Sequence, residues 1–255
     1  MCEFASLVVA KKSVHWCMED SHEKIIEEHN LTADGVRGPN IVRVEIVPPD
    51  RDPSRPLDEW IYRIDQDLLP NWHDAEDTER RARGALIDLV AARVFLTGEH
   101  EVGPGYFVAA GDARLASGSA SVRASGSASV EASGSASVEA YGSASVRASG
   151  SASVEASSSA SVRAHGSASV EAYGSASVEA YDSASVEAYG SASVEAYGSA
   201  SVRAYGSASV RACKDHATCR HYNPQDCKPD GPFAVMIDCT GARAACSIAA
   251  EAEGA

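Results

Sequence analysis

The octapeptide Gly118-Ser-Ala-Ser-Val-Arg-Ala-Ser125 begins a run of twelve such units that continues without a gap to Cys213. The general pattern is Gly-Ser-Ala-Ser-Val-Glu/Arg-Ala-Tyr/Ser. In the first unit Ala120, Val122 and Ala124 alternate with polar residues. A period of two, closed by a corner that contains glycine, is typical of a β-strand followed by a tight turn. The run therefore predicts short strands joined by tight corners.

A single Ala-Val-Ala strand buries too little apolar surface to be stable, so the strands must stack. Strands stacked about 4.8 Å apart would bury a continuous thin core. The array therefore predicts a β-solenoid over residues 118–213, with two units in each 16-residue coil. Three units in a triangular 24-residue coil are the alternative, although the small inward residues favour the flatter coil. The low complexity also allows disorder, but a linker needs neither the constant valine nor the strict alternation.

The sixth position of each unit carries arginine or glutamate, and the eighth changes from serine to tyrosine along the array. In 16-residue coils, alternate units share a face, so their glutamates would form a row of like charges. Such a row is mildly destabilising, so it is either tolerated or used for binding. A tyrosine column is more typical of a packing ladder than of a ligand platform. The candidate binding face consists of Glu139, Glu155, Glu171, Glu187, Tyr173, Tyr189 and Tyr205.

Residues 1–100 predict a small α+β domain with the element order ββαββα. Segments 4–10 and 13–17 predict a hairpin, and Asp20-Ser21 predicts the start of a short helix over 21–30. Alternation predicts a strand over 41–47, and a fourth strand is expected over 60–65. A long amphipathic helix is expected over 75–96. Its predicted apolar stripe contains Ala82, Leu86, Leu89, Val90 and Val94.

Residues 101–117 are expected to form a junction and the N-terminal cap of the solenoid. Within them, Gly111–Ser117 is similar to a repeat that is one residue short. Residues 214–255, which are rich in cysteine, are expected to form the C-terminal cap or tail. Caps are needed because exposed sheet edges would pair with other chains.

The net charge of the chain is −14, of which residues 1–117 carry −9 and the array −3. This acidity disfavours binding to nucleic acid or to an anionic membrane surface. No run of about 18 apolar residues is present, and the N-terminal charges do not follow the order of a signal peptide. The sequence therefore predicts a cytoplasmic protein.

Cysteine and histidine residues cluster at the end of the array, and their spacing would allow a tetrahedral zinc site. The set lacks a Cys-x-x-Cys pair, which favours buried or unligated thiols instead. Disulfides would require an oxidising compartment. These three alternatives stay open, and no other cofactor is expected. The candidate ligands are Cys213, His216, Cys219, His221 and Cys227.

Two further observations bear on catalysis. Asp20, His22 and Glu23 lie near Cys17, and they are best interpreted as solvated charges at a capped helix start. The chain contains no glycine-rich phosphate loop, nucleophile elbow or His-Glu-x-x-His motif. The sequence therefore predicts a protein that is not an enzyme.

Before the array, the chain contains Val42-Arg-Val-Glu-Ile46, Glu59-Trp60, Asp65 and Pro70-Asn-Trp72. Together with the Tyr-Gly-Ser-Ala-x-Val units, these segments resemble uncharacterised bacteriophage and actinobacterial proteins with a small N-terminal domain and an octapeptide array. The array is more distantly similar to ice-nucleation proteins, whose repeats form a 16-residue solenoid, but it lacks their Thr-x-Thr rows. The resemblance implies a bacteriophage origin, a place in the host cytoplasm or the virion, and no established activity.

Two functions follow as hypotheses. The first is a non-enzymatic scaffold or protein-binding β-solenoid, with a structural or host-interaction role, whose partner is another protein or a second copy. The second is an acidic DNA-mimic inhibitor of a nucleic-acid enzyme, as pentapeptide-repeat proteins are for gyrase. The five arginines of the array count against the second hypothesis.

Overall fold

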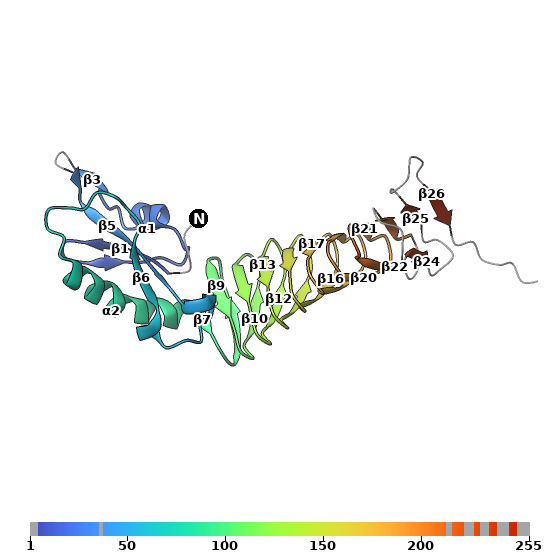
Figure 1. Cartoon of the computed structure of the whole chain (residues 1–255), viewed down its shortest axis with the longest axis horizontal. Coiled ribbons are helices and arrows are strands. Elements are labelled where there is room, and N and C mark those ends of the chain that lie inside the picture. Colours follow the sequence, from blue (N-terminus) through green and yellow to red (C-terminus); the bar gives the residue numbers. More distant parts are fainter. Residues whose placement is uncertain are drawn as a thin grey trace, which may run out of the picture. The chain divides into compact units, whose positions relative to one another are not determined.

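The computed structural model describes residues 5–35, 38–212, 216–221, 227–229, 235–238 and 245–248. The chain divides into two compact units, Met1–Phe95 and Leu96–Ala255 (Figure 1). The first unit contains mixed strands and helices, and the second is a β-solenoid. The prediction of a β-solenoid behind an N-terminal region of strands and helices is therefore confirmed.

The first unit is built on a four-stranded antiparallel sheet with the order β2-β1-β5-β6. Its central strand β5 contains Val42, Val44 and Ile46, which are fully buried on one face. A two-stranded hairpin and a short strand at the end of the unit complete its β-structure. The strands are β1 (Ser6–Ala10), β2 (Val14–His15), β3 (Asp34–Gly35), β4 (Gly38–Pro39), β5 (Ile41–Val47), β6 (Ile61–Ile64) and β7 (Val94–Phe95).

Two α-helices accompany the sheet, α1 (His22–Glu28) and α2 (Ala75–Arg93), and two 3₁₀ turns span Pro49–Arg51 and Leu57–Glu59. Side chains cap both helices: Ser21 accepts a hydrogen bond from the Lys24 amide, and Asp74 accepts one from the Asp77 amide. Helix α2 packs along β1 and β2 (Figure 1). Neither of these described helices is long and apolar enough to cross a membrane.

Helix α2 ends three residues before the predicted boundary of 96, because Val94 and Phe95 adopt extended backbone as β7. β-branched and aromatic residues fit a strand better than a helix end. The buried face of α2 is formed by Thr78, Ala82, Leu86, Leu89 and Arg93. Val90 and Val94, expected on the apolar stripe, are only partly buried.

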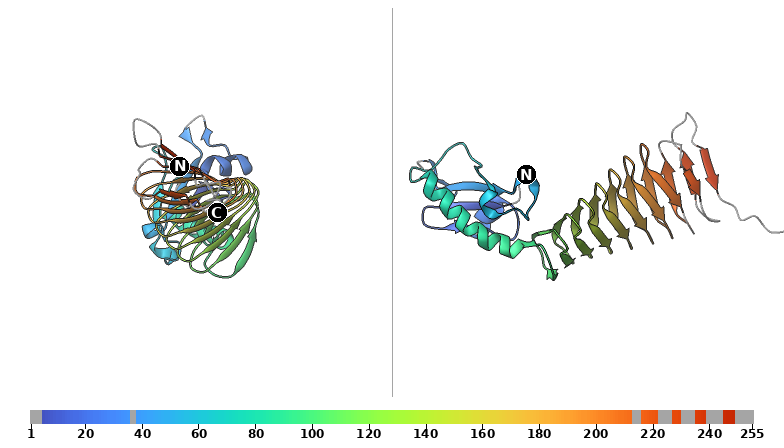
Figure 2. Two further views of the ribbon diagram at one scale, coloured as in Figure 1. Left: turned by 90° about the vertical axis from the view of Figure 1, so that its right-hand side faces the viewer. Right: turned by 60° about the horizontal axis from the view of Figure 1, so that its bottom comes forward.

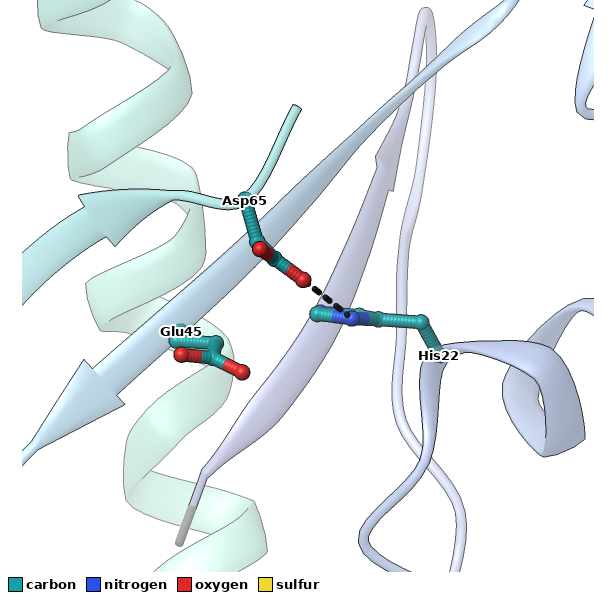
Figure 3. Close-up of side chains that lie close together, drawn as sticks. All are labelled: His22, Glu45 and Asp65. Carbon is teal, nitrogen blue, oxygen red and sulfur yellow. Dashed lines mark ion pairs between the residues drawn. The ribbon is translucent and has the colours of Figure 1, made fainter. Parts of the chain in front are cut away.

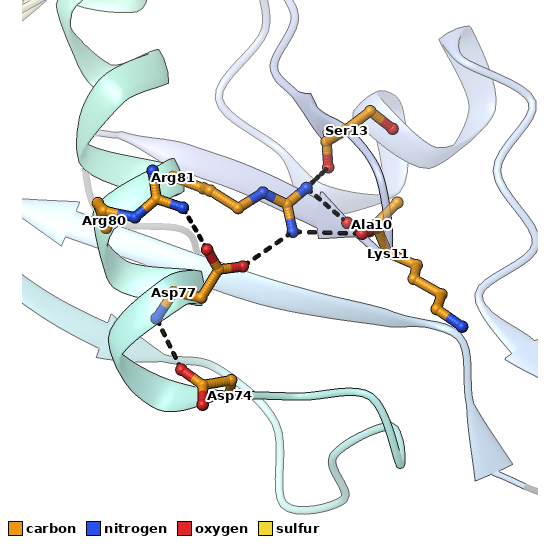
Figure 4. A network of polar contacts seen from close by, with 7 residues as sticks. All are labelled: Ala10, Lys11, Ser13, Asp74, Asp77, Arg80 and Arg81. Carbon is orange, nitrogen blue, oxygen red and sulfur yellow. Dashed lines mark hydrogen bonds and ion pairs between the residues drawn. The ribbon is translucent and has the colours of Figure 1, made fainter.

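Two arginines of α2 anchor the helix to the N-terminal hairpin region. Arg81 donates to the Ala10 and Ser13 carbonyls at 2.8 and 2.9 Å (Figure 4). Arg93 is 1% exposed and forms an ion pair with Asp20 at 3.3 Å. The guanidinium of Arg93 also donates to the Cys17 and Glu19 carbonyls.

The interpretation of Asp20 and His22 as solvated charges is therefore wrong. Asp20 pairs with the buried Arg93, and His22 is itself 1% exposed. The predicted cap at Ser21 is present, but the tertiary partners of Asp20 and His22 come from elements that lie far along the chain. Short-range sequence patterns carry no information about such partners.

The second unit contains two sheets of mostly parallel strands, and up to β25 the strands of the chain alternate between them (Figure 2). The solenoid strands of the first sheet are β9 (Tyr106–Ala109), β11 (Ser121–Ala124), β13 (Ser137–Ala140), β15 (Ser153–Ala156), β17 (Ser169–Ala172), β19 (Ser185–Ala188), β21 (Ser201–Ala204), β23 (Thr218–His221), β25 (Val235–Asp238) and β26 (Ala245–Ile248). The second sheet consists of β8 (Glu99–Val102), β10 (Arg114–Ser117), β12 (Ser129–Ala132), β14 (Ser145–Ala148), β16 (Ser161–Ala164), β18 (Ser177–Ala180), β20 (Ser193–Ala196), β22 (Ser209–Ala212) and β24 (Cys227–Pro229).

The core between the sheets is made of alanine and valine. The inward alanines and valines from Ala120 to Val210 are at most 3% exposed. Each inner strand pairs in register with the strand 16 residues later, as Val122 does with Val138. The backbone groups of the corners also bond from coil to coil; for example, the Tyr173 amide donates to the Ala156 carbonyl at 2.8 Å. Backbone pairing between coils thus supports a core that is too thin to be stable in a single unit.

The first coils of the solenoid are one residue shorter than those within the array, whereas the last described coils are one residue longer, as in the pairing of Val202 with Cys219. Leu115 pairs with Val130 and Phe107 with Val122, 15 residues apart. The missing residue is a corner residue. In an ordinary corner the Ala128 amide donates to the Ser125 carbonyl, whereas in the short corner the Ala120 amide donates to the Ser117 hydroxyl at 2.9 Å. The inward side chain of Ser117 thus replaces the missing carbonyl.

The solenoid strands begin at Glu99, before the start of the recognisable repeats. At the other end, β26 pairs antiparallel with β25, which reverses the chain direction. All other described strand pairs of the solenoid are parallel.

Candidate partner-binding face

The outward side of the first sheet carries a row of four glutamates. Strand register places Glu139 beside Glu155, Glu155 beside Glu171, and Glu171 beside Glu187. Neighbouring parallel strands lie about 4.8 Å apart, so these carboxylates lie closer together than the screening length of physiological salt. The glutamate row, defined as these four residues, is therefore a locally concentrated negative charge.

A row of serines runs beside the glutamate row. Alternation along each strand sends the residue two positions before each glutamate to the same outward face. Serine and glutamate side chains border a shallow groove with a volume of about 300 Å³. Its floor is the backbone of the inward-facing valines. The serine row consists of Ser137, Ser153, Ser169 and Ser185, all of which are exposed.

The two ends of the glutamate row are neutralised by arginine. Glu139 forms an ion pair with Arg123 at 2.8 Å, and Glu187 forms one with Arg203 at 2.7 Å. Glu155 and Glu171 lie between these pairs and are exposed. Within the described part of the chain, neither of them has an ion-pair partner. The uncompensated charge of the groove is thus concentrated at its centre.

Tyrosines at the corners of the first sheet form a stacked ladder. The rings of Tyr173, Tyr189 and Tyr205 follow one another at centroid distances of 5.0 and 4.9 Å, nearly parallel. The hydroxyl groups of Tyr173 and Tyr189 donate to Glu171 and Glu187 at 2.7 Å. Those hydrogen bonds raise the pKa of both phenols to about 12. The ladder therefore packs as a column, and it also holds two carboxylates of the glutamate row.

The outward face of the second sheet has a different charge pattern. Arg147 lies beside Arg163, and Arg163 pairs with Glu179 at 2.8 Å. A second aromatic ladder on this side contains His165, Tyr181 and Tyr197, with ring centroids 4.7 and 4.8 Å apart. The mixed signs produce no acidic row comparable to that of the first sheet in the described structure.

The structure thus brings together all seven residues of the candidate binding face. Sequence reasoning missed the serine row, although the same alternation places it on the outward side. It also missed the two arginines that limit the acidic charge to the centre of the groove. Their positions at the ends of the row follow from the pairing of strands 16 residues apart.

The candidate zinc ligands lie largely outside the described residues. Cys213 is not described, and neither are the side chains of His221 and Cys227. Cys219 takes the inward position of Val202 in the next coil and is 1% exposed, whereas His216 is exposed. The zinc site stays a prediction.

Neither a comparison with protein-family models nor searches of curated proteins and of solved structures found a match to this chain.

Proposed function

We propose that the solenoid is a non-enzymatic docking scaffold that binds an extended basic segment of a protein partner along the groove of the first sheet. The observation that supports this proposal is the glutamate row, whose central members Glu155 and Glu171 are exposed and have no ion-pair partner in the described structure.

The shape and chemistry of the groove fit an extended chain. Four strands at about 4.8 Å spacing give it a length of about 14 Å, which about four or five residues of an extended peptide would span. Lysine or arginine side chains would pair with the carboxylates, and the serine hydroxyls would bond to backbone groups of the peptide. Attraction between these opposite charges accelerates association, and salt weakens the attraction.

The array would also act as a stiff spacer. We propose a coil of two octapeptides, which the 16-residue pairing of the strands supports. A rod of such coils holds the carboxylates of the glutamate row at fixed intervals. The solenoid therefore loses little conformational entropy on binding. A structural or host-interaction role in a bacteriophage is consistent with such a rod.

The DNA-mimic function is less well supported. A mimic of DNA needs acidic groups at phosphate-like intervals over a long surface. The second sheet instead places Arg147 and Arg163 side by side, and arginine closes both ends of the glutamate row.

Binding of a fluorescent decalysine peptide to the full chain, followed by anisotropy at low salt, tests the proposal. We expect the double substitution Glu155→Gln/Glu171→Gln to weaken binding by about tenfold, because both uncompensated charges are lost. The matched control is Glu131→Gln/Glu195→Gln, which removes two charges from the second sheet. Equal affinities of the two variants would contradict the proposal.

A further inference from the structure

Three potential metal ligands converge in the first unit, away from the solenoid (Figure 3). His22 is the first residue of α1, Glu45 lies on β5, and Asp65 directly follows β6. One ligand atom from each residue lies within 4.8 Å of the other two. The three residues are separated by about twenty positions each in sequence, so the sheet and helix α1 bring them together.

The imidazole of His22 is oriented as metal-binding histidines usually are. The residue is 1% exposed, and Nε2 lies 3.0 Å from the Val44 carbonyl oxygen. A carbonyl oxygen only accepts hydrogen bonds, so Nε2 carries the hydrogen and donates. In the neutral ring, Nδ1 then presents a lone pair. A hydrogen bond from one ring nitrogen to a backbone carbonyl is the arrangement that fixes the tautomer in metal sites.

The lone pair of Nδ1 faces carboxylates. Asp65 Oδ2 lies 3.4 Å from Nδ1, and the carboxylate of Glu45 lies on the same side (Figure 3). Asp65 is 56% exposed, so its side chain has room to adjust. Ligand atoms on one ion at about 2.1 Å are at most about 4.2 Å apart. The His22–Asp65 pair already meets this limit, and a pair at 4.8 Å would need to close by only about 0.6 Å.

We propose that His22, Glu45 and Asp65 form a mononuclear binding site for a divalent first-row transition metal ion. One nitrogen and two carboxylate ligands suit Mn²⁺ and Zn²⁺, whereas Mg²⁺ and Ca²⁺ prefer ligand sets made of oxygen alone. The exposed side of Asp65 leaves further coordination positions to water. Arg63 is the cross-strand neighbour of Glu45, so the ion must compete with its guanidinium, which indicates moderate affinity.

Titration of the full chain with Mn²⁺ tests this site, with the EPR signal of the free ion as the readout. Mn²⁺ is chosen because thiolates of the cysteines would capture Zn²⁺. We expect saturable binding that Asp65→Asn weakens by more than about tenfold. The matched control is Asp67→Asn, an exposed aspartate two residues away that undergoes the same change of charge.

Acidic residues of the solenoid are a second source of Mn²⁺ binding, and NMR distinguishes the two. Bound Mn²⁺ broadens nearby signals, so the amides around His22, Val44 and Asp65 should disappear first. The proposal is overturned if no saturable binding occurs, if Asp65→Asn and Asp67→Asn bind equally, or if the broadening is confined to the solenoid.

Discussion

At the residue scale, the first position of each octapeptide is the most constrained. From Gly126 onward the glycine there has a positive φ, for example +65° at Gly150, where a Cβ would lie 3.1 Å from the backbone of the preceding coil. Two units break the rule: Ser158 and Asp182 adopt φ of +60° and +56°. Asp182 gains some compensation, because its carboxylate accepts a hydrogen bond from the Gly166 amide at 3.0 Å.

Replacement of Ser158 by glycine should therefore stabilise the solenoid. A side chain in the left-handed region costs about 1 kcal/mol, which Ser158→Gly removes. We expect the urea midpoint of the β-sheet circular dichroism signal to rise. Asp182→Gly should give a smaller gain, because it also removes the hydrogen bond. The control Ser159→Gly changes a residue with ordinary backbone angles, and an equal gain there would refute the explanation.

A second residue-scale expectation concerns alkaline pH. The pKa of Tyr173 and Tyr189 is raised from 10.0 to about 12 in the folded chain, chiefly by hydrogen bonds to Glu171 and Glu187. Because the folded pKa is the higher one, the stabilisation is complete below pH 10 and is lost as the pH rises through 12.

Absorbance of tyrosinate measures this directly. In the wild-type chain, two tyrosines should titrate near pH 12, and Glu171→Gln/Glu187→Gln should lower their pKa toward 10. If the titration curve is unchanged by this double substitution, the carboxylates are not the cause.

At the element scale, helix α2 is fixed by buried charge as well as by its apolar stripe. The side chains of Arg93 and Asp20 are 1% and 9% exposed, so each buried charge is compensated by the other. Removal of one partner from a buried ion pair leaves an uncompensated charge, which costs about 3–5 kcal/mol. The mostly exposed Arg80 lies on the same helix and offers a comparison.

We therefore expect Arg93→Ala to destabilise the first unit by about 3–5 kcal/mol, and Arg80→Ala by less than about 0.5 kcal/mol. Tryptophan fluorescence in urea reports this unit alone, because Trp16, Trp60 and Trp72 all lie within it. Similar midpoints for the two variants would show that Arg93 has no anchoring role.

Elements with a strong local pattern could be predicted from sequence. The strand expected over 41–47 was found as Ile41–Val47, and every complete octapeptide supplied one strand. Ahead of the array, the short repeat Gly111–Ser117 could be recognised, but the strand Glu99–Val102 could not, because His100 stands where the repeat has its valine. The clustering of His22, Glu45 and Asp65 was equally unpredictable, since it depends on tertiary packing.

At the scale of the whole molecule, the charge is unevenly distributed. Residues 1–117 carry −9 and the array only −3, yet the array contains an ordered row of four glutamates on neighbouring strands. For binding, the regular arrangement of the charges matters here more than the net charge. A partner attracted merely by net charge would collect on the N-terminal region, whereas a partner that recognises the groove would lie on the first sheet.

Carbodiimide cross-linking of the full chain to decalysine, followed by peptide mass spectrometry, tests the docking groove most directly, because it forms amides only where a carboxylate touches a lysine. We expect the cross-links to concentrate on Glu155 and Glu171 and to be sparse on Glu131 and Glu195 of the second sheet. Cross-links spread in proportion to acidity, and therefore mostly over residues 1–117, would contradict a docking role for the glutamate row.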